Sequence, residues 1–274
     1  TMRDALMKSK NVITVDLAME LNVGKVMNLA HKAGLPKVER AYPSMALGTA
    51  EATPLQMAEA YTAFANLGDK VSPIAINRVT TGEGKTIATP TGEKKNILRD
   101  DVAYIMNDMM KDVINKGTAA EAKAWGFTNV EGKRGYAGKT GTSRDGWFVG
   151  FTPELVVAVY VGFDNGDDLG MKGSDSAMPI WAEFMREALR LHPEWNGDWR
   201  MPVTIRKAEI DTRTGKLIRE LTDTEAASVA AQQEVIEKNK TVNAELDDPN
   251  LEDLYVSNIP LEFRRIELFI SGTV

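Results

Sequence analysis

The chain has 274 residues, of which 43% are hydrophobic and 26% are charged, and its formal net charge is -6. This length and hydrophobic content suffice for one well-packed core, or for one core and a smaller appended unit. The absence of cysteine excludes disulfides and thiolate metal sites, and the acidic balance argues against a nucleic-acid-binding face. The longest apolar run, Leu155 to Val161, has the length of a strand, so no membrane span is predicted.

The first third of the chain is predicted to be mostly helical. The apolar periodicity of residues 12–21 predicts one helix, and Asn22 is suited to cap a second helix that ends at Gly34. Thr53, Pro54 and Gln56 have the spacing of a capping box with a proline in the first turn. A third helix is therefore expected to run from there to the glycine at position 68.

Short strands and turns are expected between this helix and the next one. Residues 69–98 contain glycines at positions 82, 84 and 92 among short strand-like runs, and glycine favours turns at such places. Asp100 or Asp101 then opens another helix with an apolar face, and Gly117 ends it.

The pattern changes to strand-like runs in the middle of the chain. Residues 135–143, 146–151 and 155–163 are predicted to form three successive strands, and the short turns between them favour antiparallel neighbours. A closing helix is expected from Pro179 to Leu191. Its inward-facing residues are predicted to be Ile180, Trp181, Phe184 and Leu189. Helices followed by an antiparallel meander and a closing helix indicate an α+β fold.

The C-terminal quarter has a different composition. We predict a main domain over residues 1–200 and a C-terminal extension over residues 201–274, which begins with a hairpin at 203–218. Residues 222–250 are polar and acidic and are expected to form a solvated helix or a mobile segment. Residues 255–269 become apolar again and are expected to dock back.

Two short motifs contain the residue types that serine acyl transfer uses. They are Ser9-Lys10-Asn11, ahead of a predicted helix, and Lys139-Thr140-Gly141-Thr142, inside a predicted strand. A fixed ammonium at Lys139 attracts a substrate carboxylate, which the two threonine hydroxyls can also bind. Gly141 allows a substrate backbone close to the strand, and an edge strand can pair with an extended peptide.

The remaining groups of the motifs suit the other steps of acyl transfer. The backbone N–H of Thr142 can stabilise an oxyanion, Ser9 can relay a proton toward a leaving amine, and Asn11 can hold a substrate amide. Each motif alone is weak evidence. Ser9 or Asn11 can simply cap a helix, and residues 139–142 can be an ordinary strand with a glycine bend.

Longer stretches of sequence surround the two motifs. They comprise residues 3–6, 47–58, 60–61, 64–68, 117–119, 137–143, 145–153 and 177–185. Together they closely resemble the transpeptidase domain of penicillin-binding proteins, and the last stretch resembles the closing helix of the class A, bifunctional subgroup of the 1A type. The similarity covers roughly residues 2–220.

The resemblance implies a fold and a chemistry. The fold is the penicillin-binding protein/serine β-lactamase-like transpeptidase fold, an α+β fold with a five-stranded antiparallel sheet flanked by helices, here incomplete at its N-terminus. The activity is DD-transpeptidation, in which a serine attacks the penultimate D-alanine carbonyl, releases D-alanine and passes the acyl group to a neighbouring amine. The implied catalytic residues are Ser9, Asn11 and Lys139, the implied substrate-binding residues are Thr140, Gly141 and Thr142, and no cofactor or metal is implied.

The same resemblance implies partners and a location. The expected ligands are peptidoglycan stem peptides that end in D-Ala-D-Ala, and β-lactams, together with proteins of cell-wall synthesis. No nucleic acid is expected. The expected location is periplasmic, on the extracytoplasmic face of the bacterial inner membrane, with an anchor and a glycosyltransferase domain that the resemblance places upstream of this chain.

The sequence departs from the family pattern at the nucleophile. None of its nine serines is followed three residues later by lysine, whereas the family places Ser-x-x-Lys ahead of its Ser-x-Asn motif. Covalent acyl transfer requires an activated nucleophile. We therefore expect this chain to be a fragment of a transpeptidase and to be inactive alone.

Two other functions fit parts of the sequence. One is a β-lactamase or DD-carboxypeptidase of the same fold, which would hydrolyse the acyl-enzyme. The other is a non-catalytic module that binds wall peptide, which the absence of Ser-x-x-Lys favours. Of the remaining residues, His31 is expected at the surface or just behind a site, and Trp147 in the core, although the resemblance implies a place near the cleft for it.

Overall fold

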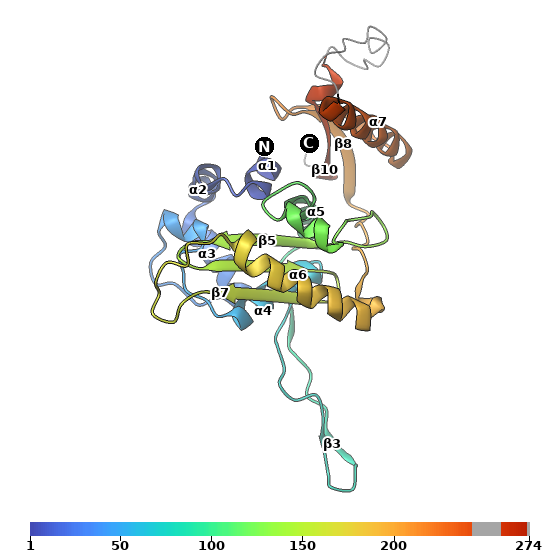
Figure 1. Ribbon diagram of the computed structural model, residues 1–274. Coiled ribbons are helices and arrows are strands. Elements are labelled where there is room, and N and C mark those ends of the chain that lie inside the picture. Colours follow the sequence, from blue (N-terminus) through green and yellow to red (C-terminus); the bar gives the residue numbers. More distant parts are fainter. Residues whose placement is uncertain (243–258, 273–274) are drawn as a thin grey trace. The chain divides into compact units, whose positions relative to one another are not determined.

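The computed structural model describes residues 1–242 and 259–272. The chain divides into two compact units, one of residues Met2–Arg200 and one of Met201–Val274 together with Thr1. Figure 1 shows the helices and strands of both.

The first unit opens with short helices, as the sequence predicts. They are α1 (Met2–Met7), α2 (Asn11–Glu20), α3 (Val23–Lys32), the 3-10 helix η1 (Pro43–Leu47) and α4 (Pro54–Ala65). The Asn22 side chain accepts a hydrogen bond from Gly24 N (2.9 Å) and caps α3. Thr53 and Gln56 form the predicted capping box at the start of α4. These caps satisfy N–H groups that the first turn of a helix leaves without partners.

The segment between α4 and the next helix forms an arm. Strands β1 (Asp69–Val71) and β4 (Lys94–Asn96) pair at its base, and β2 (Val79–Thr80) pairs with β3 (Thr86–Ala88) farther out. Figure 1 shows this arm extending away from the sheet and helices of the unit. Helix α5 (Asp100–Asn115) and the 3-10 helix η2 (Ala120–Trp125) follow it.

The centre of the first unit is an antiparallel sheet of three strands. Strands β5 (Ala137–Thr142), β6 (Gly146–Phe151) and β7 (Val156–Val161) lie in the order β5-β6-β7, and the three strands predicted from the sequence are confirmed. The family pattern implies five strands, of which the described residues contribute these three. In this sheet β5 is an edge strand.

Helices cover both faces of this sheet. Phe148 and Phe151 on β6 are an odd number of residues apart, so their side chains point to opposite faces. Phe148 contacts Trp181 on one face (ring centroids 4.9 Å apart), and Phe151 contacts Tyr61 of α4 on the other (5.8 Å). We call these the α6 face and the α4 face, after the helices that cover them.

Helix α6 (Gly173–Leu191) begins six residues before the predicted start at Pro179. Proline favours the first turn of a helix, which suggested that start. The first turn is set instead by Asp175 N and Ser176 N, which both donate to Lys172 O at 3.0 Å. Pro179 lies inside the helix.

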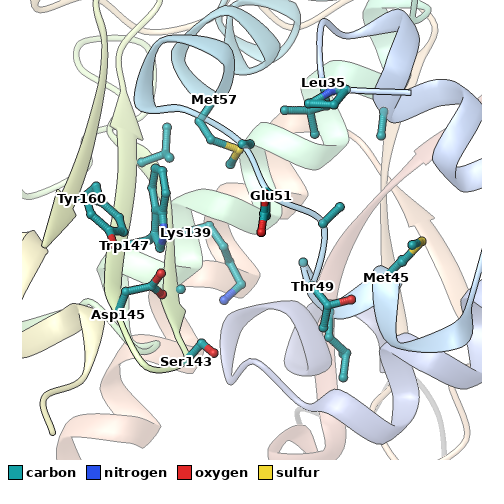
Figure 2. A pocket seen from close by; sticks show the side chains of 18 of the residues that line it. Leu35, Met45, Thr49, Glu51, Met57, Lys139, Ser143, Asp145, Trp147 and Tyr160 are labelled. Carbon is teal, nitrogen blue, oxygen red and sulfur yellow. The ribbon is translucent and has the colours of Figure 1, made fainter. Parts of the chain in front are cut away.

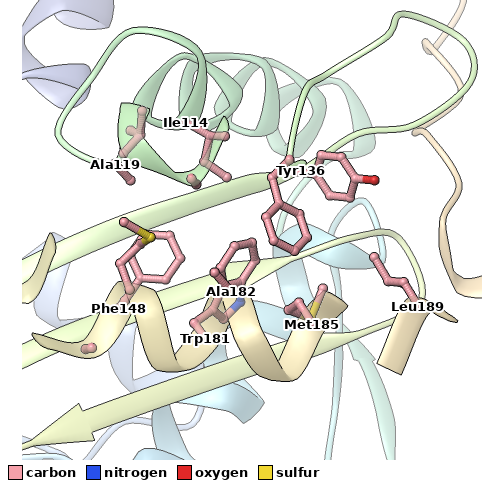
Figure 3. Close-up of a cluster of buried hydrophobic side chains, with 13 residues drawn as sticks. Ile114, Ala119, Tyr136, Phe148, Trp181, Ala182, Met185 and Leu189 are labelled. Atoms are coloured by element: carbon pink, nitrogen blue, oxygen red, sulfur yellow. The ribbon is translucent and has the colours of Figure 1, made fainter. Parts of the chain in front are cut away.

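The buried side of α6 also differs from the prediction. Trp181 and Leu189 are buried, but Ile180 and Phe184 are 52% and 55% exposed, so their inward orientation was wrong. The inward stripe consists of Met178, Trp181, Ala182, Met185 and Leu189, at the spacing of one helix face. Figure 3 shows this stripe packed with Phe148, Ile114, Ala119 and Tyr136 into the main core.

The second unit contains an antiparallel sheet in the order β10-β8-β9. Its elements are β8 (Ile205–Asp211), β9 (Leu217–Leu221), α7 (Asp223–Val242), the 3-10 helix η5 (Leu261–Phe263) and β10 (Arg264–Ile270). Glu209 is fully buried here and forms ion pairs with Arg219 (3.1 Å) and Arg264 (3.9 Å). Of the segment expected to be a solvated helix or mobile, residues 223–242 are helical, and 243–250 lie outside the described residues. The same holds for 255–258 of the segment expected to dock back.

Among residues 1–242 and 259–272, every helix is too short or too polar to cross a bilayer.

Candidate functional site

The structure brings together Ser9 and Lys139, which are 130 residues apart in the sequence. The Lys139 ammonium donates a hydrogen bond to Ser9 Oγ (2.9 Å) and another to Thr140 O (3.0 Å). The two motifs singled out in the sequence therefore meet at one place in the first unit. Their roles in catalysis stay predictions.

Helix α1 sets the position of Ser9. The buried Arg3 of α1 pairs with Asp108 (2.5 Å) and Asp112 (3.1 Å) of α5, and α5 packs beside β5. The end of α1 is held by Thr118 N, which donates to Met7 O (3.2 Å). These contacts tie the turn after α1 to the element that carries Lys139.

The turn itself holds Ser9 in an unusual conformation. Ser9 has φ 52°, in the left-handed region, which residues other than glycine seldom adopt. Helix α2 begins two residues later, at Asn11. Such conformations cost roughly 1–3 kcal/mol and persist where surrounding contacts enforce them. The side chain of Ser9 is exposed and directed to Lys139.

Asn11 occupies the first position of α2 and is exposed, and no hydrogen bond from its side chain is seen within residues 1–242 and 259–272. It lies on the same turn as Ser9, which leaves its amide available to a ligand. The cap position of α2 belongs to Lys10 rather than to Ser9 or Asn11.

Lys139 is desolvated without a neutralising partner. Burial lowers the pKa of Lys139 to about 8. Within the described residues no carboxylate forms an ion pair with its ammonium, which instead contacts a hydroxyl and a carbonyl. Desolvation disfavours the charged form, and no opposite charge offsets that effect. The ammonium thus retains its capacity to attract an anion.

The pleat of β5 separates the ammonium from the two threonine hydroxyls. Lys139 pairs across the sheet with Val149, and Thr140 pairs with Phe148, so Lys139 lies on the α4 face and Thr140 on the α6 face. Thr140 Oγ1 hydrogen-bonds Thr118 Oγ1 (2.7 Å) on that side. Lys139, Thr140 and Thr142 nevertheless all line the cavity described below, and their joint binding of one carboxylate stays a prediction.

Thr142 ends the strand and is exposed. Its Oγ1 accepts a hydrogen bond from Gly173 N (3.0 Å) at the start of α6, so its O–H remains free to donate to another group. Gly141 precedes it on the α4 face, where a Cβ would lie 3.0 Å from Trp147 Cβ. A larger residue at position 141 would crowd this wall of the site.

A cavity of about 750 Å³ opens on the α4 face beside Lys139. Figure 2 shows Lys139, Trp147 and Tyr160 on one wall and Glu51, Met57 and Thr49 on the other. Apolar side chains of α3, η1 and α4 also line it, as do Thr140, Gly141 and Thr142 of β5 and the acidic residues Glu51 and Asp145. Ser9 is not among the lining residues and reaches the site through Lys139.

Sequence reasoning missed part of this wall. The residue pattern favoured the core for Trp147 and the resemblance implied a place near the cleft; Trp147 lines the cavity and contacts Tyr160 (ring centroids 4.9 Å apart). Strand alternation puts Trp147 on the same face as Val149, and the register with β5, which the sequence alone does not give, sets it opposite Gly141. Thr118 was also missed as a partner of Thr140, since their contact joins a loop to a strand.

No group of three or more metal-ligating acids or histidines occurs among the residues that the structure describes. The groups available at this site are an ammonium, hydroxyls, amides, the carboxyl groups of Glu51 and Asp145, and an open strand edge.

The sequence matches a family model and several curated proteins. Residues 1–186 match the family model described as the penicillin binding protein transpeptidase domain. The chain is 39% identical over 201 residues to penicillin-binding protein 1A of Neisseria lactamica, covering 70% of this chain and 25% of that protein. It is 37% identical over 207 residues to penicillin-binding protein 1A of Aquifex aeolicus (strain VF5), covering 74% and 27%. The chain spans about a quarter of the length of these curated relatives.

Solved structures show the same fold. The crystal structure of penicillin-binding protein 1A from Haemophilus influenzae matches with a TM-score of 0.75 at 23% identity, covering 99% of this chain and 40% of that chain. The structure of PonA1 from Mycobacterium tuberculosis in complex with penicillin V matches with a TM-score of 0.60 at 24% identity, covering 74% and 58%. The penicillin-binding protein fold expected from the sequence is confirmed.

Proposed function

The chain belongs to the penicillin-binding protein transpeptidase family, and from this membership we propose that it forms part of a peptidoglycan DD-transpeptidase. The observation that carries the proposal is the contact between Lys139 Nζ and Ser9 Oγ (2.9 Å) at the rim of a large cavity. It joins a cation for the substrate carboxylate to a hydroxyl for proton transfer.

In this proposal β5 takes the donor stem peptide at its free edge. An extended peptide can add to an edge strand by main-chain hydrogen bonds. The Thr142 hydroxyl, exposed at the end of β5, donates to the terminal carboxylate of the peptide. Lys139, on the other face of the strand, supplies the positive potential that attracts it. A charge with little solvent around it acts more strongly than one in water.

Ser9 relays a proton in the same proposal. Its hydroxyl accepts from Lys139 and can pass its own proton to a departing amine, while Asn11 on the same turn binds a peptide amide. The attacking serine and its lysine base belong to a Ser-x-x-Lys segment, which the 274-residue sequence does not contain. The expected inactivity of this chain alone follows from that difference.

The activity of the whole protein, its location and its partners are proposed from the same family membership. The chain spans about a quarter of its relatives, so the activity of the whole protein, including glycosyltransferase activity, is a proposal. We place it in the periplasm, with β-lactams, D-Ala-D-Ala peptides and proteins of cell-wall synthesis as partners.

A peptide-binding experiment tests the proposed carboxylate site. The 274-residue chain is titrated with an acyl-Lys-D-Ala-D-Ala peptide and with its C-terminal amide, and binding is measured by calorimetry or by NMR shifts. The free acid is expected to bind at least tenfold more tightly, since a hydrogen bond to a charged group contributes about 1.5–3 kcal/mol. The Lys139→Ala variant is expected to lose this preference, and the Lys123→Ala variant, which changes an exposed lysine, to keep it.

Equal affinity for acid and amide would contradict the carboxylate site. Retained preference in the Lys139→Ala variant would assign the recognition to other residues. A non-catalytic wall-peptide module would also prefer the acid, so covalent labelling by a fluorescent penicillin is needed to separate that function from an enzyme. Release of a bound acyl group to water rather than to an amine would indicate a hydrolase.

A further inference from the structure

The contact between Ser9 and Lys139 has the geometry of a nucleophile with its base. We propose that Ser9 and Lys139 form a Ser–Lys dyad of this chain itself, in which Ser9 Oγ accepts acyl or phosphonyl groups from small uncharged donors. This activity goes beyond the wall-peptide site and does not depend on it. The dyad stands on three separate features of the described residues.

The first feature is the hydrogen bond itself. The distance from Lys139 Nζ to Ser9 Oγ is 2.9 Å, within the reach that a general base requires. In the ammonium form Lys139 donates to Ser9. In the neutral form the hydrogen bond reverses, and Ser9 O–H donates to the amine.

The second feature is the environment of the base. Burial lowers the pKa of Lys139 to about 8, so a substantial fraction of the amine is neutral near that pH. Glu51 and Asp145 line the cavity together with Lys139, Lys8 and Lys10 flank Ser9 in the chain, and Asp112 lies on the neighbouring helix α5. Asp112 is already paired with Arg3, and none of these carboxylates forms an ion pair with Lys139 in the part of the chain that the structure describes.

The third feature is the backbone around Ser9. Ser9 adopts φ 52° in a turn that leads directly into α2, and strained turns before a helix are known to expose nucleophiles. The first backbone hydrogen bond of α2 runs from Thr14 N to Lys10 O (3.3 Å). The N–H groups of residues 11–13 are left by the helix for an outside acceptor, so developing negative charge near Ser9 is favoured.

The reaction step balances without a cofactor. Ser9 Oγ attacks the electrophilic carbon or phosphorus, its proton passes to neutral Lys139 Nζ, and the leaving group departs. With an alkyl fluorophosphonate the Oγ–P bond forms, the P–F bond breaks and fluoride leaves. The donor must be uncharged, because a carboxylate would favour the ammonium form of Lys139 and remove the base.

An alkyl fluorophosphonate probe tests the dyad on the 274-residue chain. Intact mass and peptide mapping should give one adduct, on Ser9, formed at a rate that rises with pH and levels above about 8. The Ser9→Ala variant should give none. The Lys139→Arg variant should react at least tenfold more slowly and without that pH step, because guanidinium stays protonated. The exposed controls Ser44→Ala and Lys10→Arg should react like the original chain.

A second variant keeps the test decisive if Ser9→Ala fails to fold. The sequence contains no cysteine, so the Ser9→Cys and Ser44→Cys variants each carry a single thiol. Iodoacetamide should alkylate the Ser9→Cys variant at least tenfold faster at pH 7, since a neighbouring ammonium lowers a thiol pKa.

Several outcomes overturn the dyad. They are an adduct on Lys139 or on another serine, no adduct at any pH, and equal alkylation of the two thiol variants. The preference for a peptide acid over its amide is a separate measurement. Either proposal can therefore fail while the other holds.

Discussion

At the scale of single residues, the site depends on where one ammonium sits. Lys139 lies on the α4 face, near a cavity and without a carboxylate partner among the described residues, and its pKa is lowered to about 8 by burial. The same burial that lowers the pKa strengthens the attraction for an anion while the charge is present. The protonation state of this residue decides which ligands the site favours.

A pH dependence of peptide binding follows. A free carboxylate binds the protonated form of Lys139, so affinity for a D-Ala-D-Ala peptide is expected to be full below about pH 7. It should fall as the pH rises through the pKa of about 8. In the Lys139→Arg variant, whose guanidinium stays charged, binding should not fall between pH 7 and 9.5. A titration at constant ionic strength measures both, and a fall of equal size in the variant would assign the effect to another group.

At the scale of elements, the site rests on two contacts between elements far apart in the chain. Helix α6 covers one face of the sheet through Trp181, whose Nε1 donates to Gly150 O (3.0 Å). Helix α1 is held on α5 by Arg3, and this contact places the turn that carries Ser9. The contact of Trp181 packs α6 against the face of the sheet opposite Lys139. The contact of Arg3 positions the turn that carries Ser9 beside β5.

Replacing Trp181 should destabilise the first unit strongly. Trp181 is fully buried against Phe127 (ring centroids 4.8 Å apart) and Phe148 (4.9 Å). The Trp181→Ala variant is expected to lose about 3–5 kcal/mol of unfolding free energy, because it leaves a large cavity. Phe184 on the same helix is 55% exposed, so Phe184→Ala should cost less than about 1 kcal/mol. Chemical denaturation measures both, and similar losses would contradict the packing described for α6.

Replacing Arg3 should detach α1. Its guanidinium is buried between Asp108 and Asp112, so the Arg3→Ala variant removes the cation that both carboxylates share and leaves Asp112, among the described residues, only the ion pair with Lys116 at 3.9 Å; the expected cost is roughly 3 kcal/mol. Hydrogen exchange should rise in residues 2–10. The exposed pair of Arg186 and Glu183 provides the control, since Arg186→Ala should cost about 0.5 kcal/mol or less. Unchanged exchange in the Arg3→Ala variant would show that other contacts hold the Ser9 turn.

At the scale of the whole molecule, local sequence patterns predicted where helices and strands occur better than they predicted which side chains of an element are buried. The capping box at Thr53 and Gln56 and the three antiparallel strands were readable because caps and turns are local. The start of α6 and the outward position of Phe184 were not, because packing against the sheet decides them. A proline favours the first turn, but Pro179 lies inside the helix.

The candidate site could be predicted from the sequence only in part. Ser9 and Lys139 are 130 residues apart, and no spacing rule joins them, so only the resemblance to a family placed them in one site. Thr140 and Lys139 are neighbours on one strand, so their side chains lie on opposite faces of the sheet. Strand alternation alone predicts this from the sequence. The position of Trp147 in the cavity wall required the register between β5 and β6.

Covalent labelling by a fluorescent penicillin tests the central claim most directly. The chain is fused behind a Ser-x-x-Lys segment of the kind that the family places ahead of its Ser-x-Asn motif, and labelling is followed on denaturing gels. The account predicts a covalent band for the fusion, at least tenfold slower labelling after Lys139→Ala, no band when the fused serine is replaced by alanine, and none for the 274-residue chain alone. Labelling of the chain alone, or equal labelling of the fusion with and without Lys139, would contradict it.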